Sequence, residues 1–442
     1  MQDGNLDPDR GLPPSNRARV IGLFLFFFLV IAAFWIQKPI RTSRFLAAVG
    51  PENLPWVKLG TALLVLPVVL LYSAVAARLR RHHLVYLCCA LFAGASILFW
   101  ASFRSEAADW THYAYFFYVD IFNSVMVALF WSFANDLSSP DEARRNYGII
   151  GAGGIIGGAV GSAFTGWSVE HLGAANLLLV CAVLLVLIAV LAGVLATGQS
   201  SPSRQPASDR QSSLSAAFAG ARLTLQSRYL TWIAFIVIAY EITSNVIDYQ
   251  FNTFVAERYR GEAAMSAFLG QFSTASIAAS AAVQFIVTTW ILRRWGPRVG
   301  LLILPLALAF GSGSILLVPV FATVAATFFS DAALSYSLNQ ASKEVLYTPT
   351  DDDTKYQAKA FIDMFLMRLG KAVSSLLILA WAAWFLPHGV QQLAILSLVV
   401  IAGWLLVARA VGSQFVEQTS AEDREPEAPA RFGLRKVVPH AP

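Results

Sequence analysis

Acidic and amide side chains recur inside one long apolar segment of this chain. Within residues 229–255, Glu241, Asn245, Asp248 and Asn252 follow one another at intervals of three or four residues. A helix turns about 100° per residue, so these positions fall within roughly 60° of one face. An ionisable group inside a membrane helix costs about 2.5–3.5 kcal/mol on insertion scales, and it therefore faces a cavity or a partner. The stripe predicts a water-filled pathway; the alternative is hydrogen-bonded contact between helices.

Basic side chains gather at the end of the first apolar segment. Lys38, Arg41 and Arg44 spread over about 120° of one helix face, with no run of acids beside them in the sequence. Arginine keeps its charge, and its planar guanidinium matches phosphate or carboxylate in two parallel hydrogen bonds. The three cations therefore predict a site for an anionic ligand.

Further charges lie within or at the edges of later apolar segments. Asp120 lies within residues 110–135, and Lys343 ends the segment 321–343. Because Glu344 follows Lys343, an ordinary interfacial ion pair is the alternative to a ligand site there. Lys359 and Asp363 are four residues apart and could pair on one helix face.

These charges can be combined into one site. Inward-facing cations from both halves of the chain, Arg41 and Lys343, would hold a polyanion. The membrane carboxylates Asp120 and Asp248 could then serve as counter-ions, gates or proton carriers.

The composition predicts the elements that must position these residues. Of 442 residues, 57% are hydrophobic and 13% charged, whereas soluble domains carry about 25% charged residues. The apolar residues would fill about twelve spanning helices of roughly 20 residues each. An outer-membrane barrel is excluded by unbroken apolar runs such as Val20–Ile36. We predict an all-α integral membrane protein with about twelve transmembrane helices, at residues 20–38, 55–77, 83–101, 110–135, 147–167, 174–197, 229–255, 265–292, 298–318, 321–343, 357–386 and 388–411.

The two halves of the chain echo one another. The basic turn at Arg78–Arg81 has a counterpart about 215 residues later, at Arg293–Arg298. This pattern is typical of a six-plus-six repeat of the major facilitator type, with a substrate site between the halves. We expect a cytoplasmic N-terminal tail at 1–19, a six-helix bundle at 20–197, a cytoplasmic linker at 198–228, a second bundle at 229–411 and a cytoplasmic C-terminal tail at 412–442.

Charge placement predicts the orientation in the membrane. The even-numbered connections carry most of the basic residues, including Arg144 and Arg145, and such connections face the cytoplasm. Both termini are therefore expected in the cytoplasm of a bacterium, with the chain in its inner membrane. The first connection breaks this rule with Lys38, Arg41 and Arg44, which favours a functional site there. The net charge of +5 is explained by topology, so we expect no nucleic-acid partner.

Motifs for catalysis, metals or cofactors are absent from the sequence. The glycine-rich stretch Gly151–Gly158 lacks the final glycine of a dinucleotide loop and a preceding strand. Its glycines, spaced as small-xxx-small pairs, predict close packing of two helices. Gly370-Lys371 lacks the other residues of a Walker loop. We expect no enzyme activity, no cofactor and no metal ion.

Several stretches resemble the ATP/ADP translocase family of plastids, intracellular bacteria and their bacterial homologues. Lys343–Asp351 is similar to the family's K-E-M-A-Y-I-P-L-D, and Thr354–Asp363 to T-K-x-K-G-K-A-x-I-D. Arg368–Lys371 is similar to L-G-K-S. Leu54–Lys58 is similar to I-P-F-L-K, and Lys38–Arg41 and Phe130–Asn135 also match. The resemblance runs from about residue 35 to 375.

The resemblance implies which charges serve transport. The family has two basic and two acidic intramembrane residues of functional importance. They fall on or near Arg41 and on Asp120, Asp248 and Lys343, where every sign is kept but three residue types differ. A phosphorylated or polyanionic substrate is implied.

From these patterns we predict a secondary active transporter that exchanges nucleotides of the ATP/ADP type, acting as a monomer in the bilayer. The predicted substrate-binding residues are Lys38, Arg41, Lys343 and Asn245; the predicted gating or coupling residues are Asp120, Glu241, Asp248, Lys359 and Asp363. One alternative is a proton-coupled carrier of another organic anion or of drugs, with Glu241 or Asp248 as the proton site. The other is a membrane scaffold or receptor that transports nothing.

Overall fold

The chain is helical throughout the part that the structure describes. The computed structural model describes residues 14–105, 107–197, 213–350, 357–359, 361–385 and 389–422. Residues 198–212 of the predicted linker, the turn at 351–356 and the acidic tail beyond Glu422 lie outside these residues. The helices are α1 (Pro14–Ala48), η1 (Pro51–Asn53), α2 (Leu54–Ala76), α3 (Arg81–Arg104), α4 (Asp109–Leu137), α5 (Pro140–Leu172), α6 (Ala174–Thr197), α7 (Ser213–Gln226), α8 (Arg228–Arg258), α9 (Glu262–Ala282), η2 (Val283–Thr288), α10 (Thr289–Leu317), α11 (Phe321–Leu334), η3 (Ser335–Asn339), α12 (Gln340–Leu346), η4 (Ile362–Leu366), α14 (Met367–Phe385), η6 (Val390–Gln392) and α15 (Leu393–Glu422).

The prediction of an all-α membrane fold is confirmed. Nine stretches of the described chain are long and apolar enough to span a membrane, and one of them, Glu262–Leu317, covers two predicted spans. Gly296, with φ 71°, separates the two. The predicted spans 321–343 and 357–386 are helical over their described residues but are interrupted by π-helical segments.

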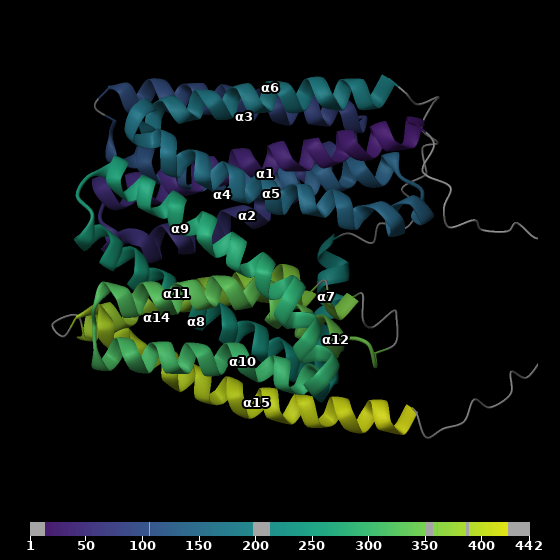
Figure 1. Ribbon diagram of the computed structural model, residues 1–442, viewed down its shortest axis with the longest axis vertical. Helices are drawn as coiled ribbons and strands as arrows, with labels where there is room; N and C mark the ends of the chain where they lie inside the picture. The colour runs from purple at the N-terminus through teal and green to yellow at the C-terminus, as the bar shows by residue number, and fades with distance from the viewer. Residues whose placement is uncertain are drawn as a thin grey trace, which may run out of the picture.

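The helices form two packed groups, which lie above and below one another in Figure 1. In the N-terminal group (α1–α6), α1 packs on α4, α5 and α6, and α3 packs on α6. In the C-terminal group (α8–α15), α8 packs on α11, α14 and α15, and α10 packs on α15. The groups meet where α5 and α1 pack on α9 and where α2 packs on α14.

The two ends of this bundle differ in what they contain. The start of α1, the end of α15 and α7 lie toward the same end of the bundle, on the right in Figure 1, and we name this the terminal end. The opposite end, where α1 leads into α2 and α8 leads into α9, is the distal end. There one apolar cluster joins both groups, with Phe45 and Val57 packed among Val246, Phe251 and Ile378.

The glycines of α5 act as the sequence predicted. A Cβ added to Gly153 or Gly161 would lie 2.6 or 2.5 Å from the carbonyl oxygens of Phe24 or Ala32 on α1. The α1 and α5 backbones therefore touch directly, as small-xxx-small spacing allows. A capping box of Ser139 and Glu142 begins the same helix.

Helices occupy parts of two segments that the sequence predicts as a tail and a linker. Helix α1 begins at Pro14 and continues to Ala48, so the predicted tail 1–19 ends inside it and Lys38, Arg41 and Arg44 are helical rather than part of a connection. The apolar run ends at the first charge, but lysine and arginine are good helix formers and do not stop the helix. The predicted linker also contains a helix, α7, which packs on α8.

Candidate substrate site

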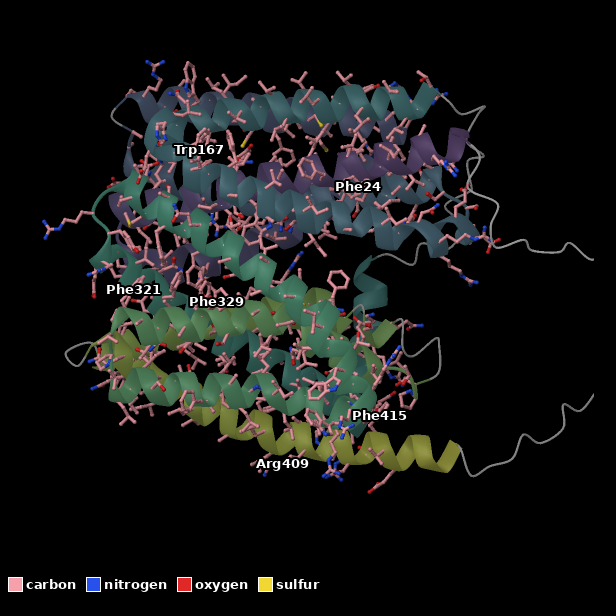
Figure 2. The ribbon with its side chains drawn as sticks, in the orientation of Figure 1. Phe24, Trp167, Phe321, Phe329, Arg409 and Phe415 are labelled. Atoms are coloured by element: carbon pink, nitrogen blue, oxygen red, sulfur yellow. The ribbon has the colours of Figure 1, made fainter. Side chains whose placement is uncertain are left out.

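Charged and amide side chains from both groups meet in the middle of the bundle. They are carried by α1, α2 and α4 of the N-terminal group and by α8, α12, η4 and α14 of the C-terminal group. π-helical segments lie just before Lys343 and around Asp363, and such segments are frequent at functional sites. Figure 2 shows the side chains of the whole bundle in place.

Arg41 on α1 pairs with Asp120 on α4. Arg41 Nη1 donates to Asp120 Oδ1, and the guanidinium carbon lies 4.0 Å from the centre of the Phe116 ring, one turn before Asp120. The Arg41 side chain is 11% exposed and that of Asp120 25%. The pair is thus partly open to water, and a planar guanidinium there can change partners from carboxylate to phosphate.

Lys58 on α2 joins the two groups through α8. Its Nζ donates to Asp248 Oδ2 and, at 2.7 Å, to Asn245 Oδ1. Asn245 in turn donates to Ser374 on α14. The predicted residues Asn245 and Asp248 therefore belong to one polar network with Lys58. The spacing of polar residues within 229–255 did not predict this lysine.

Lys343 pairs with Asp363, and Lys359 pairs with Glu344. The first distance is 2.9 Å and the second 2.5 Å between nitrogen and oxygen. The predicted i, i+4 pair of Lys359 with Asp363 is therefore wrong, because the neighbouring helix α12 offers each residue an opposite charge and η4 separates the two with a π turn. The side chain of Lys343 is 8% exposed and that of Lys359 34%, so Lys343 belongs to the interior and Lys359 to its edge.

Glu241 faces Lys371 on α14. The carboxylate and ammonium are 3.9 Å apart, and the Glu241 side chain is 5% exposed while that of Lys371 is 57% exposed. Gly370 allows this approach, since a Cβ there would lie 2.8 Å from Glu241 Cβ. Lys343 also lies in the electrostatic neighbourhood of Glu241, which connects the charges of α12 and α14.

Lys38 differs from the other cations. Its ammonium lies 4.2 Å from the centre of the Trp35 ring, and within the described residues no carboxylate lies at ion-pair distance from it. Its electrostatic neighbours are Arg41, Asp120, Asp248 and Lys371. Lys38 is therefore a cation in the centre of the charge cluster that has an aromatic ring, but not an acid, as its partner.

Arg44 does not belong to the anion site that the sequence predicted. It pairs at 2.8 Å with Glu262, the first residue of α9, and its guanidinium lies over the Phe103 ring at 3.9 Å. Nearby, Ser43 and Ser266 hydroxyls bond to one another across the groups. Arg41 and Arg44 both pair with acids distant in the sequence. Of the three cations, only Lys38 has no carboxylate at ion-pair distance within the described residues.

At the terminal end, the ion pairs stay within one group. Arg19 pairs with Glu142, Arg81 with Asp136 at 3.1 Å, and Lys359 with Glu344. The cross-group pairs of the described residues, those of Lys58 and Arg44, lie toward the distal end. Within the described residues, ion pairs therefore link the two groups at the distal end.

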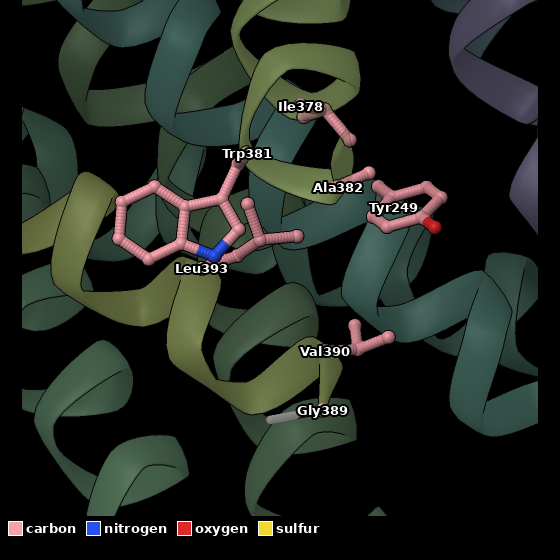
Figure 3. A pocket seen from close by; sticks show the side chains of 7 residues that line it. All are labelled: Tyr249, Ile378, Trp381, Ala382, Gly389, Val390 and Leu393. Atoms are coloured by element: carbon pink, nitrogen blue, oxygen red, sulfur yellow. The ribbon is translucent and has the colours of Figure 1, made fainter. Parts of the chain in front are cut away.

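A small pocket elsewhere is apolar and is not this site. It lies between α8, α14 and the start of α15 and is lined by Tyr249, Ile378, Trp381, Ala382, Gly389, Val390 and Leu393 (Figure 3). It contains none of the predicted site residues. It offers no charge to an anionic ligand, so the charge cluster remains the candidate site.

Sequence reasoning missed three charged residues of the interior. Lys58 and Lys371 stand in the stretches Leu54–Lys58 and Arg368–Lys371 that carry the family resemblance, and that was the available signal. Asp331 is 4% exposed on α11; a single acid inside the apolar run 321–343 could have identified it.

Fold and site together define a class of protein, an all-α membrane protein in which two helix groups enclose a charged centre. Solved structures with this fold include the nucleoside transporter NupG, with a TM-score of 0.59 and 12% identity over 91% of this chain and 98% of that one. Another is a bacterial homologue of the human lysosomal transporter Spinster, in an inward-facing and unoccupied conformation, with a TM-score of 0.58 and 14% identity over 92% of this chain and 99% of that one. These similarities concern the fold.

The chain belongs to the TLC ATP/ADP transporter family, whose model matches residues 100–415. The resemblance read from the sequence is confirmed. The plastidic ATP/ADP-transporter of Solanum tuberosum is 25% identical over 72% of this chain and 56% of its own length. The ADP,ATP carrier protein 1 of Chlamydia muridarum is 23% identical over 92% of this chain and 90% of its own. The chain thus spans little more than half of the plastid relative, and these relatives are named as carriers rather than enzymes.

Proposed function

We propose that this protein is a secondary active transporter that exchanges nucleotides of the ATP/ADP type by alternating access. The observation that supports this proposal is the convergence of lysine and arginine side chains from both helix groups on one partly water-exposed centre. Phosphate groups are the anions that such a set of donors suits. The names of the plastid and Chlamydia relatives support the choice of nucleotide.

In this proposal, Arg41 and Lys343 bind phosphates from opposite groups. Lys38 is the first contact, because it has no carboxylate to release, and Trp35 beside it holds its ammonium in place. Asn245 completes the substrate-binding set through its hydrogen bond from Lys58. Each phosphate oxygen that reaches Arg41 or Lys343 competes with Asp120 or Asp363 for the same donor.

The carboxylates are the gating residues of the proposal. Asp248 holds Lys58 across the two groups, so a phosphate that takes Lys58 also releases the link between α2 and α8. Asp120, Glu241 and Asp363 hold the remaining cations while no substrate is bound, and Lys359 orients Glu344 at the edge of the site. Arg41 and Lys343 are both paired in the described structure. Exchange follows if the cross-group pairs hold the empty carrier closed until a nucleotide replaces them.

The orientation, the division into halves and the location complete the proposal. Because basic connections face the cytoplasm, the terminal end lies on the cytoplasmic side in this proposal, and the cross-group ion pairs close the distal end. Residues 20–197 and 229–411 are the two halves that rock, with 198–228 between them and the tails 1–19 and 412–442 in the cytoplasm. The protein acts as a monomer in a bacterial inner membrane.

Uptake of labelled ATP into proteoliposomes tests this function. We expect uptake only when the vesicles contain ADP, and uptake that is independent of internal ADP would reject exchange. Lys343→Gln should lower uptake about tenfold or more, since hydrogen bonds from charged donors contribute roughly 1.5–3 kcal/mol. Lys343→Arg, which keeps the charge, should retain more of the rate. Equal rates in the Gln variant and the unaltered protein would remove Lys343 from the site.

A further inference from the structure

One buried carboxylate beside the site has no cation as its partner. Asp331 on α11 is 4% exposed. Ser244 on α8 donates its hydroxyl to Asp331 Oδ2 at 2.5 Å, while Oδ1 has no hydrogen-bond partner. In the part of the chain that the structure describes, no lysine or arginine lies at ion-pair distance from it. An ionised carboxylate in such a place lacks the compensation that burial requires.

The groups around Asp331 add to this imbalance. Tyr240, Glu241 and Asp248 on α8 lie in its electrostatic neighbourhood, as does Tyr336 on η3. Helices α9 and α10 also pack near α11, but within the described residues they add no charged group to this set. Nearby carboxylates and burial both favour the neutral, protonated acid. Lys371 is directed toward Glu241, at 3.9 Å, and does not offset them.

An exposed phenol lies near this acid. Tyr336 is 78% exposed, and Lys371, Glu241 and Asp331 are among its electrostatic neighbours. Tyr336 lies in the π-helical segment η3, about one turn after Asp331. The backbone N–H of Ser335 donates to the carbonyl oxygen of Asp331. A proton could therefore pass from water past the phenol to the unpartnered oxygen of Asp331.

We infer that Asp331 is a proton-binding site of the transport cavity and that its protonation favours the binding of an anionic substrate. Four cations of the centre have acids as partners, which leaves Lys38 positive and Asp331 negative. When Asp331 Oδ1 takes a proton from water, Lys38 becomes the uncompensated charge and the cavity gains positive potential. The proton returns to water when the anion leaves. This inference rests on the proposed function for the identity of the anion, for which ADP is the probe.

Transport under a pH gradient tests the inference. Vesicles containing ADP would be offered labelled ADP at equal pH and at one pH unit more acid outside. For the unaltered protein we expect the acid condition to raise initial uptake severalfold, up to about tenfold for one proton. Asp331→Asn should bring the ratio of initial uptake in the acid condition to that at equal pH close to one. Any ratio above one that remains in this variant reports titration of the nucleotide itself. The exposed Asp109 at the start of α4 provides the matched control, and Asp109→Asn should keep the original ratio. An unchanged ratio in Asp331→Asn would overturn the inference.

A second variant acts on the same acid without removing it. Because Ser244 donates to the ionised carboxylate, Ser244→Ala should favour the protonated form and move the midpoint of the pH profile to higher pH. This variant keeps the test decisive if Asp331→Asn does not fold. A midpoint that stays in place in folded Ser244→Ala would contradict the inference.

A measurement without nucleotide separates this inference from the proposed function. Infrared difference spectra of the purified protein during a pH titration should contain the carbonyl band of a protonated carboxylic acid, and the band should be lost in Asp331→Asn. If the band behaves so while no nucleotide is taken up, the proposed substrate is wrong and the proton site stands. If nucleotide is exchanged but the band persists in the variant, the proton site is wrong.

Discussion

The two ends of the helix bundle hold charged residues in different ways. At the distal end, Arg44 pairs with Glu262 across the two groups, and Lys58 also pairs with Asp248 across them. At the terminal end, Arg81 pairs with Asp136 and Lys359 with Glu344, each inside one group. In the proposed mechanism, pairs of the first kind break when the groups rock, whereas pairs of the second kind move with their group. Under that proposal, the position of an ion pair separates gating from packing, although the residue types are the same.

Breaking the cross-group pair nearest the site should have the largest effect. Asp248→Asn removes the charge that holds Lys58, so the empty carrier can change state without a nucleotide. We expect uptake of labelled ATP into vesicles without internal ADP to rise about tenfold above that of the unaltered protein, corresponding to about 1.4 kcal/mol less cost for the empty transition. Uptake that still depends fully on internal ADP would show that this pair is not a gate.

The pair of Arg44 and Glu262 should have an intermediate effect, on the stability of the closed state. Glu262→Gln leaves the partly buried Arg44 without its acid. We expect the free energy of unfolding, measured by thermal unfolding, to fall by about 1–3 kcal/mol. Arg44→Glu combined with Glu262→Arg restores a pair across the groups. The double variant should recover part of the loss with a coupling energy of roughly 0.5–3 kcal/mol; strictly additive losses would argue that the two residues act separately.

The smallest effect is expected at the terminal end. Asp136→Asn removes a surface pair in which the Asp136 side chain is 48% exposed, and exposed pairs contribute about 0.2–1 kcal/mol. Dependence of uptake on internal ADP should stay as in the unaltered protein, because the pair lies within one group. A leak as large as that of Asp248→Asn would remove the distinction between the two ends.

The helices and the polar face of α8 could be predicted from the sequence because both depend on local spacing. Apolar runs of about 20 residues indicate spans, and the intervals in Glu241, Asn245 and Asp248 indicate one helix face. The glycine contacts of α5 with α1 were predictable for the same reason. The extent of α1 past Lys38 was not, since a charge ends an apolar run without ending a helix.

The partners of the charged residues could not be predicted. Arg41 and Asp120 are 79 residues apart, and Lys58 and Asp248 are 190 apart, so only the packing of helices from distant parts of the chain joins them. Where local spacing did offer a pair, Lys359 with Asp363, the neighbouring α12 supplied stronger partners to both. Asp331 was missed because it stands alone inside its apolar segment, without the repetition that made the α8 stripe visible.

The position of Lys38 would make the membrane voltage part of the proposed transport cycle. With Asp331 protonated, Lys38 is the charge of the described centre that no acid balances. Moving one elementary charge through the full field amounts to about 2.3 kcal/mol per 100 mV. Under the inside-negative potential of a bacterial inner membrane, an empty carrier with the proposed orientation would rest with its cavity toward the cytoplasm. Its resting direction would then be set by the electrical state of the cell as well as by nucleotide concentrations.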